Sequence, residues 1–229
     1  MLNKKILSMV AIFVASSFSV FGQNSSFLSL SSSLGLSKVT FESETGELRN
    51  YATEMHFNQA FGAGIATPSG FTIGLDFAKT DYSGVSKGID HEVYFSQLQT
   101  SMLLGYTLKK ATTWSFLAGP YYGQINQARS IAGQEQYNNV NPYFTENDMG
   151  LNVRISTDIQ SKGSPIAFSP FVNGIVGLQN IEGDDAVNGQ STRLASYNLG
   201  ISVKYIFKKP DPVKENVIDD ERKETSDES

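Results

Sequence analysis

The most constraining feature of this sequence is the unbroken alternation in YNLGISVKYIF, residues 197–207. Leu199, Ile201 and Val203 occupy one parity, whereas small or polar residues such as Gly200 and Ser202 occupy the other. Successive side chains of a β-strand point to opposite faces, so this segment predicts a strand with one apolar face. Whether that face meets a protein core or lipid decides the class of protein.

The same period-two pattern recurs along most of the chain, without a competing helical period. It predicts eight strands, at residues 27–41, 55–65, 71–78, 93–108, 114–123, 148–156, 166–178 and 197–207. Short turn-like connections (67–70, 109–113, 160–164) alternate with longer polar stretches (42–52, 83–92, 128–144, 182–192). This alternation predicts an all-β fold, an eight-stranded antiparallel up-and-down barrel with turns at one end and loops at the other.

Two kinds of closed barrel fit this pattern. In a soluble barrel the apolar parity points inward, whereas in a transmembrane barrel it faces lipid. The other parity is dominated by small residues, where a water-exposed strand favours Lys, Glu and Thr; its glycines are Gly35, Gly62, Gly64, Gly74, Gly105, Gly119, Gly123, Gly150, Gly177 and Gly200. Small side chains suit the cramped inside of an eight-stranded barrel. The sequence therefore predicts lipid outside, with a soluble secreted barrel as the alternative.

Aromatic residues gather near the predicted strand ends, as in the interfacial girdles of membrane barrels. We expect one girdle at the turn end (Phe27, Phe71, Tyr106, Trp114, Phe207) and one nearer the loops (Phe41, Tyr82, Tyr94, Tyr122, Tyr197).

The few charged residues on the lumen parity carry both signs. Unpaired buried charges are costly, so these residues predict a paired polar network inside the barrel. The candidates for this network are Glu54, His56, Asp76, Asp148, Arg154 and Lys204, with Asp158 on the same parity.

Two features disturb the regular pattern. Pro120 and Pro170 fall inside predicted strands, where each removes a ladder donor and suggests a bulge or a break. Several large residues also fall on the lumen parity: Leu103, Leu117, Tyr121, Phe171 and Ile175. Either they pack inside the barrel, or bulges shift the register of their strands.

Both ends of the chain differ from the middle. Residues 1–22 combine Lys4 and Lys5 with an apolar run and a plausible cleavage motif, which predicts a cleaved signal peptide. The barrel is expected over residues 23–207. Residues 208–229 are charged and nearly devoid of apolar side chains, which predicts a short disordered periplasmic tail.

From the signal segment to Phe207 the chain resembles the small OmpA/OmpX-like outer-membrane β-barrels of Gram-negative bacteria. Its last strand is similar to their C-terminal assembly signal, through Asn198, Gly200, Val203, Tyr205 and Phe207. The resemblance implies insertion by the outer-membrane assembly machinery, periplasmic turns and extracellular loops. The tail after Phe207 departs from the pattern, because this signal often ends the chain.

The residues that could carry chemistry are few. The chain lacks cysteine and has a formal net charge of -5, which disfavours thiolate chemistry and a nucleic-acid-binding surface. His56 shares a strand face with Glu54, as a general base and its orienting carboxylate would. An interior histidine in a polar network explains the same pattern. His91, between Asp90 and Glu92, is a second candidate, for metal binding or for a solvated loop.

These observations predict a non-enzymatic, monomeric outer-membrane barrel without cofactor or metal. Its expected role is structural, adhesive or accessory to a surface or secretion complex. A narrow porin-like channel and a lipid-modifying enzyme are the alternatives. The expected partners are outer-membrane lipid and lipopolysaccharide, the assembly machinery, and a periplasmic or surface protein.

Overall fold

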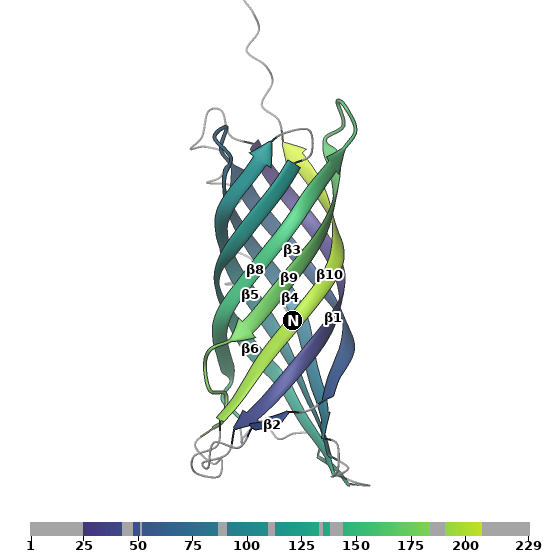
Figure 1. Cartoon of the computed structure of the whole chain (residues 1–229), viewed down its shortest axis with the longest axis vertical. Coiled ribbons are helices and arrows are strands. Elements are labelled where there is room, and N and C mark those ends of the chain that lie inside the picture. The colour runs from purple at the N-terminus through teal and green to yellow at the C-terminus, as the bar shows by residue number, and fades with distance from the viewer. Residues whose placement is uncertain are drawn as a thin grey trace, which may run out of the picture.

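The computed structural model describes residues 25–42, 48–50, 52–86, 91–109, 113–132, 135–137, 144–183 and 191–207. Eight long strands form a barrel (Figure 1): β1 (Ser25–Glu42), β3 (Ala52–Ala66), β4 (Phe71–Ser86), β5 (His91–Lys109), β6 (Thr113–Ala132), β8 (Asn147–Gln160), β9 (Ile166–Gly177) and β10 (Ser191–Phe207). Two short strands, β2 (Leu48–Asn50) and β7 (Glu135–Tyr137), lie at the loop end. The predicted signal peptide and tail lie outside the described residues and remain predictions.

The barrel closes through its first and last long strands. β1 pairs with β10 from Ser26 opposite Phe207 to Glu42 opposite Ser191, without a shift of register. Each remaining long strand pairs antiparallel with its sequence neighbours. The predicted eight-stranded antiparallel barrel is therefore confirmed. Among the described residues, no helix is long and apolar enough to cross a membrane.

The strands run further toward the loops than the sequence pattern predicts. Ser86 pairs with His91, and His91 also pairs with Ala132, so β4, β5 and β6 continue into segments that we expected to be loops. Backbone pairing holds these segments as strands although their polar composition resembles that of loops. The predicted turns at 67–70 and 160–164 are confirmed, and their Gly70 and Gly163 have φ values of 99° and 80° that favour glycine.

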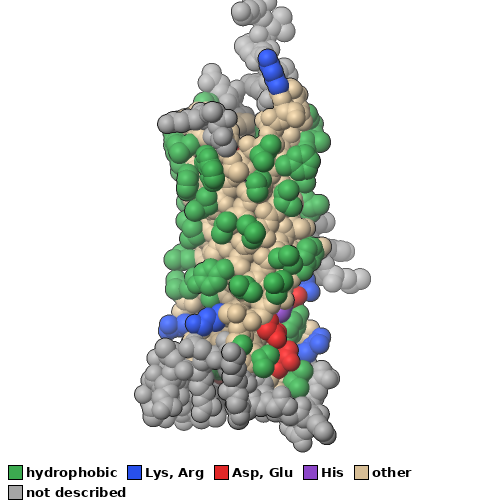
Figure 2. All heavy atoms as spheres, turned by 45° about the vertical axis from the view of Figure 1, so that its right-hand side comes forward, with side chains coloured by type: hydrophobic (Ala, Val, Ile, Leu, Met, Phe, Trp, Pro, Cys, Tyr) green, Lys and Arg blue, Asp and Glu red, His purple; other side chains and the backbone are tan. Residues whose placement is uncertain are grey.

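The distribution of side chains is inverted relative to a soluble protein. Leu30, Phe57, Leu151 and Leu199 are exposed on the outer surface, whereas Ser31, Gln97 and Asn152 are buried inside. Figure 2 shows hydrophobic side chains spread over the outside of the barrel. A contiguous exposed apolar surface of this extent is foreign to soluble monomers. Lipid therefore surrounds the barrel, and the soluble alternative is wrong.

The outward-facing hydrophobic residues form a band that we call the apolar belt, running from Leu30 to Leu36 on β1 and from Tyr197 to Tyr205 on β10. Three of the aromatics that we expected in the girdles do not belong to it. Phe27 lines the inside of the barrel, Tyr82 is fully buried there, and Phe41 packs against internal residues. Each shares the parity of its strand's lumen residues, which overrides its position at a strand end.

The prolines neither break nor shift their strands. Pro120 pairs with Leu151 and Pro170 with Ile201, and each ladder is interrupted only on the other side of the proline. The register shifts lie elsewhere, between Ser96 and Gln97 on β5 and between Thr53 and Gln59 on β3. The large residues on the lumen parity are all buried inside the barrel: Leu103, Leu117, Tyr121, Phe171 and Ile175.

Candidate functional site: the filled lumen

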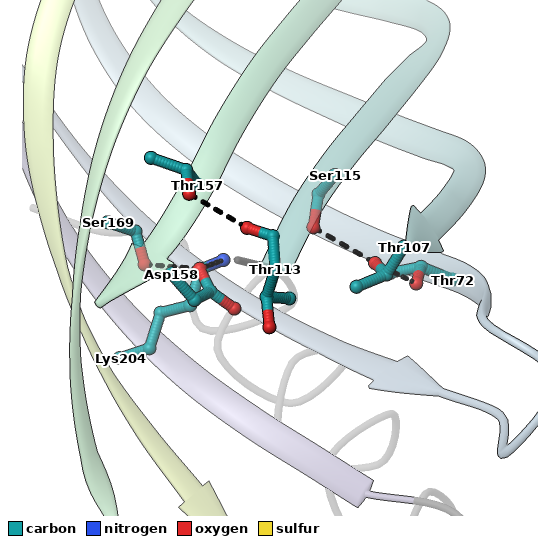
Figure 3. A network of polar contacts seen from close by, with 8 residues as sticks. All are labelled: Thr72, Thr107, Thr113, Ser115, Thr157, Asp158, Ser169 and Lys204. Carbon is teal, nitrogen blue, oxygen red and sulfur yellow. Dashed lines mark hydrogen bonds and ion pairs between the residues drawn. The ribbon is translucent and has the colours of Figure 1, made fainter. Parts of the chain in front are cut away.

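The turn end of the lumen holds a cavity of about 320 Å³ with polar and apolar lining, the turn-end cavity. On one side the hydroxyl groups of Thr72, Thr107 and Ser115 form a chain, with oxygen separations of 2.8 and 2.9 Å. On the other, Lys204 Nζ lies 2.7 Å from Asp158 Oδ1, to which Ser169 Oγ also donates (Figure 3). The charge of Asp158 is thus compensated by the neighbouring ammonium group.

An ion pair lies further toward the middle of the lumen. Arg154 Nη1 lies 2.6 Å from Asp76 Oδ2, and the guanidinium group lies 4.7 Å from the centre of the Phe171 ring. Gly62 makes this arrangement possible, because a Cβ there would overlap Asp76 Oδ1. The space beside the pair measures about 20 Å³, roughly the room that one water molecule requires.

At mid-height a chain of amide groups crosses the lumen, and we call it the amide chain. Asn58 donates to Asn198 at 2.7 Å, Asn198 donates to Asn173 at 3.0 Å, and Asn173 donates to Asn152. Asn152 in turn donates to Ser101 Oγ at 3.0 Å, which completes a path across five strands. A side chain at Gly35 would overlap Asn198 Oδ1, so this glycine leaves room for the chain.

Asp148 lies nearer the loops and is fully buried. Tyr121 donates a 2.6 Å hydrogen bond to Asp148 Oδ2. In the described part of the chain, Asp148 has no cationic partner, unlike Asp76 and Asp158. Close by, Gln97 Nε2 donates to the hydroxyl of Tyr82 at 3.1 Å.

Glu54 and His56 lie beside a gap in the ladder between β3 and β4. His56 Nε2 lies 2.9 Å from Ser83 Oγ, which donates a hydrogen bond to Glu54 Oε2. The hydroxyl proton of Ser83 is thus directed at Glu54 rather than at His56. Ser83 is also only 1% exposed. This geometry differs from a nucleophile activated by histidine.

The lumen ends at the loop side in an internal apolar group, the loop-end cluster: Val39, Tyr82, Val93, Phe95, Ile125, Ala128, Ile181 and Leu194. Phe144 packs edge-on against Phe95, with ring centres 4.8 Å apart. Phe144 and Ile181 lie outside the long strands, so connecting segments fold over the end of the barrel. Beside them burial raises the pKa of Glu182, which accepts a hydrogen bond from Thr192.

The structure distributes the six predicted lumen residues over separate levels. Asp76 and Arg154 contact each other, and so do Glu54 and His56 through Ser83, whereas Lys204 binds Asp158. Sequence reasoning missed the amide chain, although each of its asparagines lies on the lumen parity of its strand.

The residues of the predicted assembly signal all lie on β10. Asn198 belongs to the amide chain, Val203 and Tyr205 face outward, and the Phe207 ring lies 4.8 Å from that of Tyr205. Their role in assembly remains a prediction.

The second histidine candidate falls partly outside the described residues. His91 begins β5, and Asp90 is not described. Among the described residues, no group of three or more His, Asp or Glu side chains is placed to hold a metal ion.

No family model and no curated protein matches the sequence. Among solved structures the chain is similar to OprG from Pseudomonas aeruginosa, with 14% identity, coverage of 80% of this chain and 96% of that one, and a TM-score of 0.48. Neisserial surface protein A matches at 14% identity over 79% and 97% of the two chains, with a TM-score of 0.44. Ail of Yersinia pestis, in complex with the heparin analogue sucrose octasulfate, matches at 11% over 80% and 99%, with a TM-score of 0.41.

Proposed function

We propose that this chain is a non-enzymatic, monomeric protein of the bacterial outer membrane with a structural, adhesive or accessory role at the cell surface. In this proposal the signal peptide directs secretion, and the assembly machinery inserts the barrel through the β10 signal. The turns and tail face the periplasm, and the loops face outward.

The observation that carries this proposal is a filled lumen inside an apolar exterior. The interior spaces beside the amide chain and the Arg154–Asp76 pair measure about 30 and 20 Å³, room for about one water molecule each. The loop-end cluster adds a layer of tightly buried and mostly apolar side chains, among them Phe95 and Leu194. Such an interior suits a scaffold that presents loops better than a conduit. Lipopolysaccharide and a periplasmic or surface protein are the partners that such a scaffold would contact.

Membrane fractionation of cells that express the full chain tests this proposal. We expect the protein in the outer-membrane fraction, with faster gel migration before boiling than after it. Recovery of the chain as free periplasmic protein would contradict the proposal. Crosslinking with and without residues 208–229 then tests whether the tail recruits a partner.

The cluster of His56, Ser83 and Glu54 makes a lipid-modifying enzyme the second candidate, although its hydrogen bonds differ from those of an activated nucleophile. Replacement of His56 by alanine distinguishes the two, because a general base cannot be lost without loss of activity. Our proposal predicts the same lipid A profile for cells with the wild-type chain, with H56A and without the gene. A lipid A species that depends on His56 would establish the enzyme instead.

A further inference from the structure

The outer surface changes chemistry where the apolar belt ends on the loop side. On β1 the outward row passes from Leu36 to Lys38, and on β10 it passes from Tyr197 through Ala195 to Arg193. Lys38 lies opposite Ala195, so Lys38 and Arg193 are diagonal neighbours on one face of adjacent strands. Long side chains at diagonal positions of adjacent strands are close enough to contact one another. Two cations therefore lie together at the rim of the belt.

Neither cation is neutralised by a salt bridge within the described part of the chain. Two other cations toward this end of the barrel are engaged: Lys79 lies 3.5 Å from Asp81, and Arg129 lies over the ring of Tyr94. Figure 2 shows lysine and arginine side chains along the lower edge of the hydrophobic band. Lys38 and Arg193 are thus available to an external anion.

The opposite wall of the barrel has a different rim. Beyond Tyr122 the outward row of β6 continues with Gln124 and Asn126, and Asn147 lies opposite Gln124 on β8. These amides are neutral, so paired cations are a property of the β1–β10 wall rather than of the whole rim.

We propose that Lys38 and Arg193 bind the phosphate of a lipid headgroup in the leaflet at the loop end. Groups just beyond the hydrocarbon region lie at headgroup level, and basic side chains there attract anionic lipid. A guanidinium offers paired donors to phosphate oxygens, and an ammonium adds a mobile point charge. The exposed Tyr197 side chain lies beside them, at the depth where interfacial tyrosines gather. This inference rests on the proposed membrane location.

Native mass spectrometry of the full chain in detergent, titrated with diphosphoryl lipid A, tests the inference. Two lost interfacial charges predict roughly 30-fold weaker binding for K38Q/R193Q. The matched control K79Q removes a cation that is already paired and should bind as the wild type does. Lipid A without phosphates should bind weakly to all three proteins, and millimolar inorganic phosphate should not displace the phosphorylated lipid.

Equal binding by the wild type and K38Q/R193Q would overturn the inference, and so would equal loss in K79Q. Displacement by inorganic phosphate would reveal a general anion site instead. Heat-modifiable migration verifies that each variant folds. If the double variant does not fold, K38Q alone replaces it, with a smaller expected loss of lipid binding. A chain that fractionates with the outer membrane without preferring phosphorylated lipid would refute this site alone.

Discussion

The two ends of the lumen are built on opposite principles. At the turn end, hydroxyl groups and the Lys204–Asp158 pair line a cavity of about 320 Å³ that water can enter. At the loop end, Phe95 and Leu194 belong to an internal cluster that is almost wholly buried. Polar groups beside water retain partners when a neighbour is lost, whereas a dry interior offers none. Removing a side-chain group should therefore lower the free energy of unfolding more elsewhere in the lumen than at the turn end.

The largest effect is expected for the Arg154–Asp76 pair, which lies beyond the floor of the turn-end cavity. R154M leaves a carboxylate without its counter-ion, and we expect the free energy of unfolding in lipid vesicles to fall by about 4 kcal/mol. R154M/D76L removes both charges and should recover most of this loss. Urea unfolding measures both, and a double variant as unstable as the single one would contradict the pairing.

The next effect is expected within the loop-end cluster. F95A removes a fully buried ring that packs against Phe144. We expect the free energy of unfolding to fall by about 3 kcal/mol, because the surrounding strands cannot close around the cavity that is left. F116A, at a lipid-facing position, is the matched control and should cost less, because lipid chains fill the space. Equal losses in urea unfolding would mean that the cluster is no better packed than the surface.

A smaller effect is expected for the amide chain. N173A removes the donor to Asn152 and the acceptor for Asn198, and we expect a loss of about 1 to 2 kcal/mol. N126A, on the outer surface, should be nearly neutral. Slower hydrogen exchange in N173A than in the wild type would count against a stabilising chain.

The smallest effect is expected at the turn-end cavity. T107V removes a hydroxyl that contacts Thr72 and Ser115, yet cavity water can take its place. We expect T107V to lower the free energy of unfolding, measured in urea, by less than about 0.5 kcal/mol. A loss as large as that of N173A would mean that the cavity is dry and that the two ends do not differ.

Much of this architecture follows from the alternation of the sequence. The parity of Leu199 and Ser202 determines which side chains face lipid, and the number of strands follows from the repeats. Parity also placed Phe27, Phe41 and Tyr82 inside, although their positions near strand ends suggested the girdles. The extension of β4, β5 and β6 beyond the alternating segments depends on backbone pairing, which is nearly independent of side-chain type.

The contacts inside the lumen were harder to predict than the wall. Opposite charges predicted pairing, but the choice of Asp76 for Arg154 and of Asp158 for Lys204 depends on the stagger between strands. The amide chain from Asn58 through Asn198 and Asn173 to Asn152 forms for the same reason, because the heights of these residues in the barrel are set by register rather than by parity. The proximity of Lys38 and Arg193 likewise follows only from the pairing of β1 with β10.

Planar-bilayer recording of the full chain tests the central claim most directly, that the barrel spans lipid with a closed lumen. Because the amide chain, the Arg154–Asp76 pair and the loop-end cluster fill the interior, we predict no discrete conductance steps for protein whose insertion is verified by heat-modifiable migration. Reproducible single-channel steps from such protein, abolished when the chain is unfolded, would contradict the closed lumen and establish a channel.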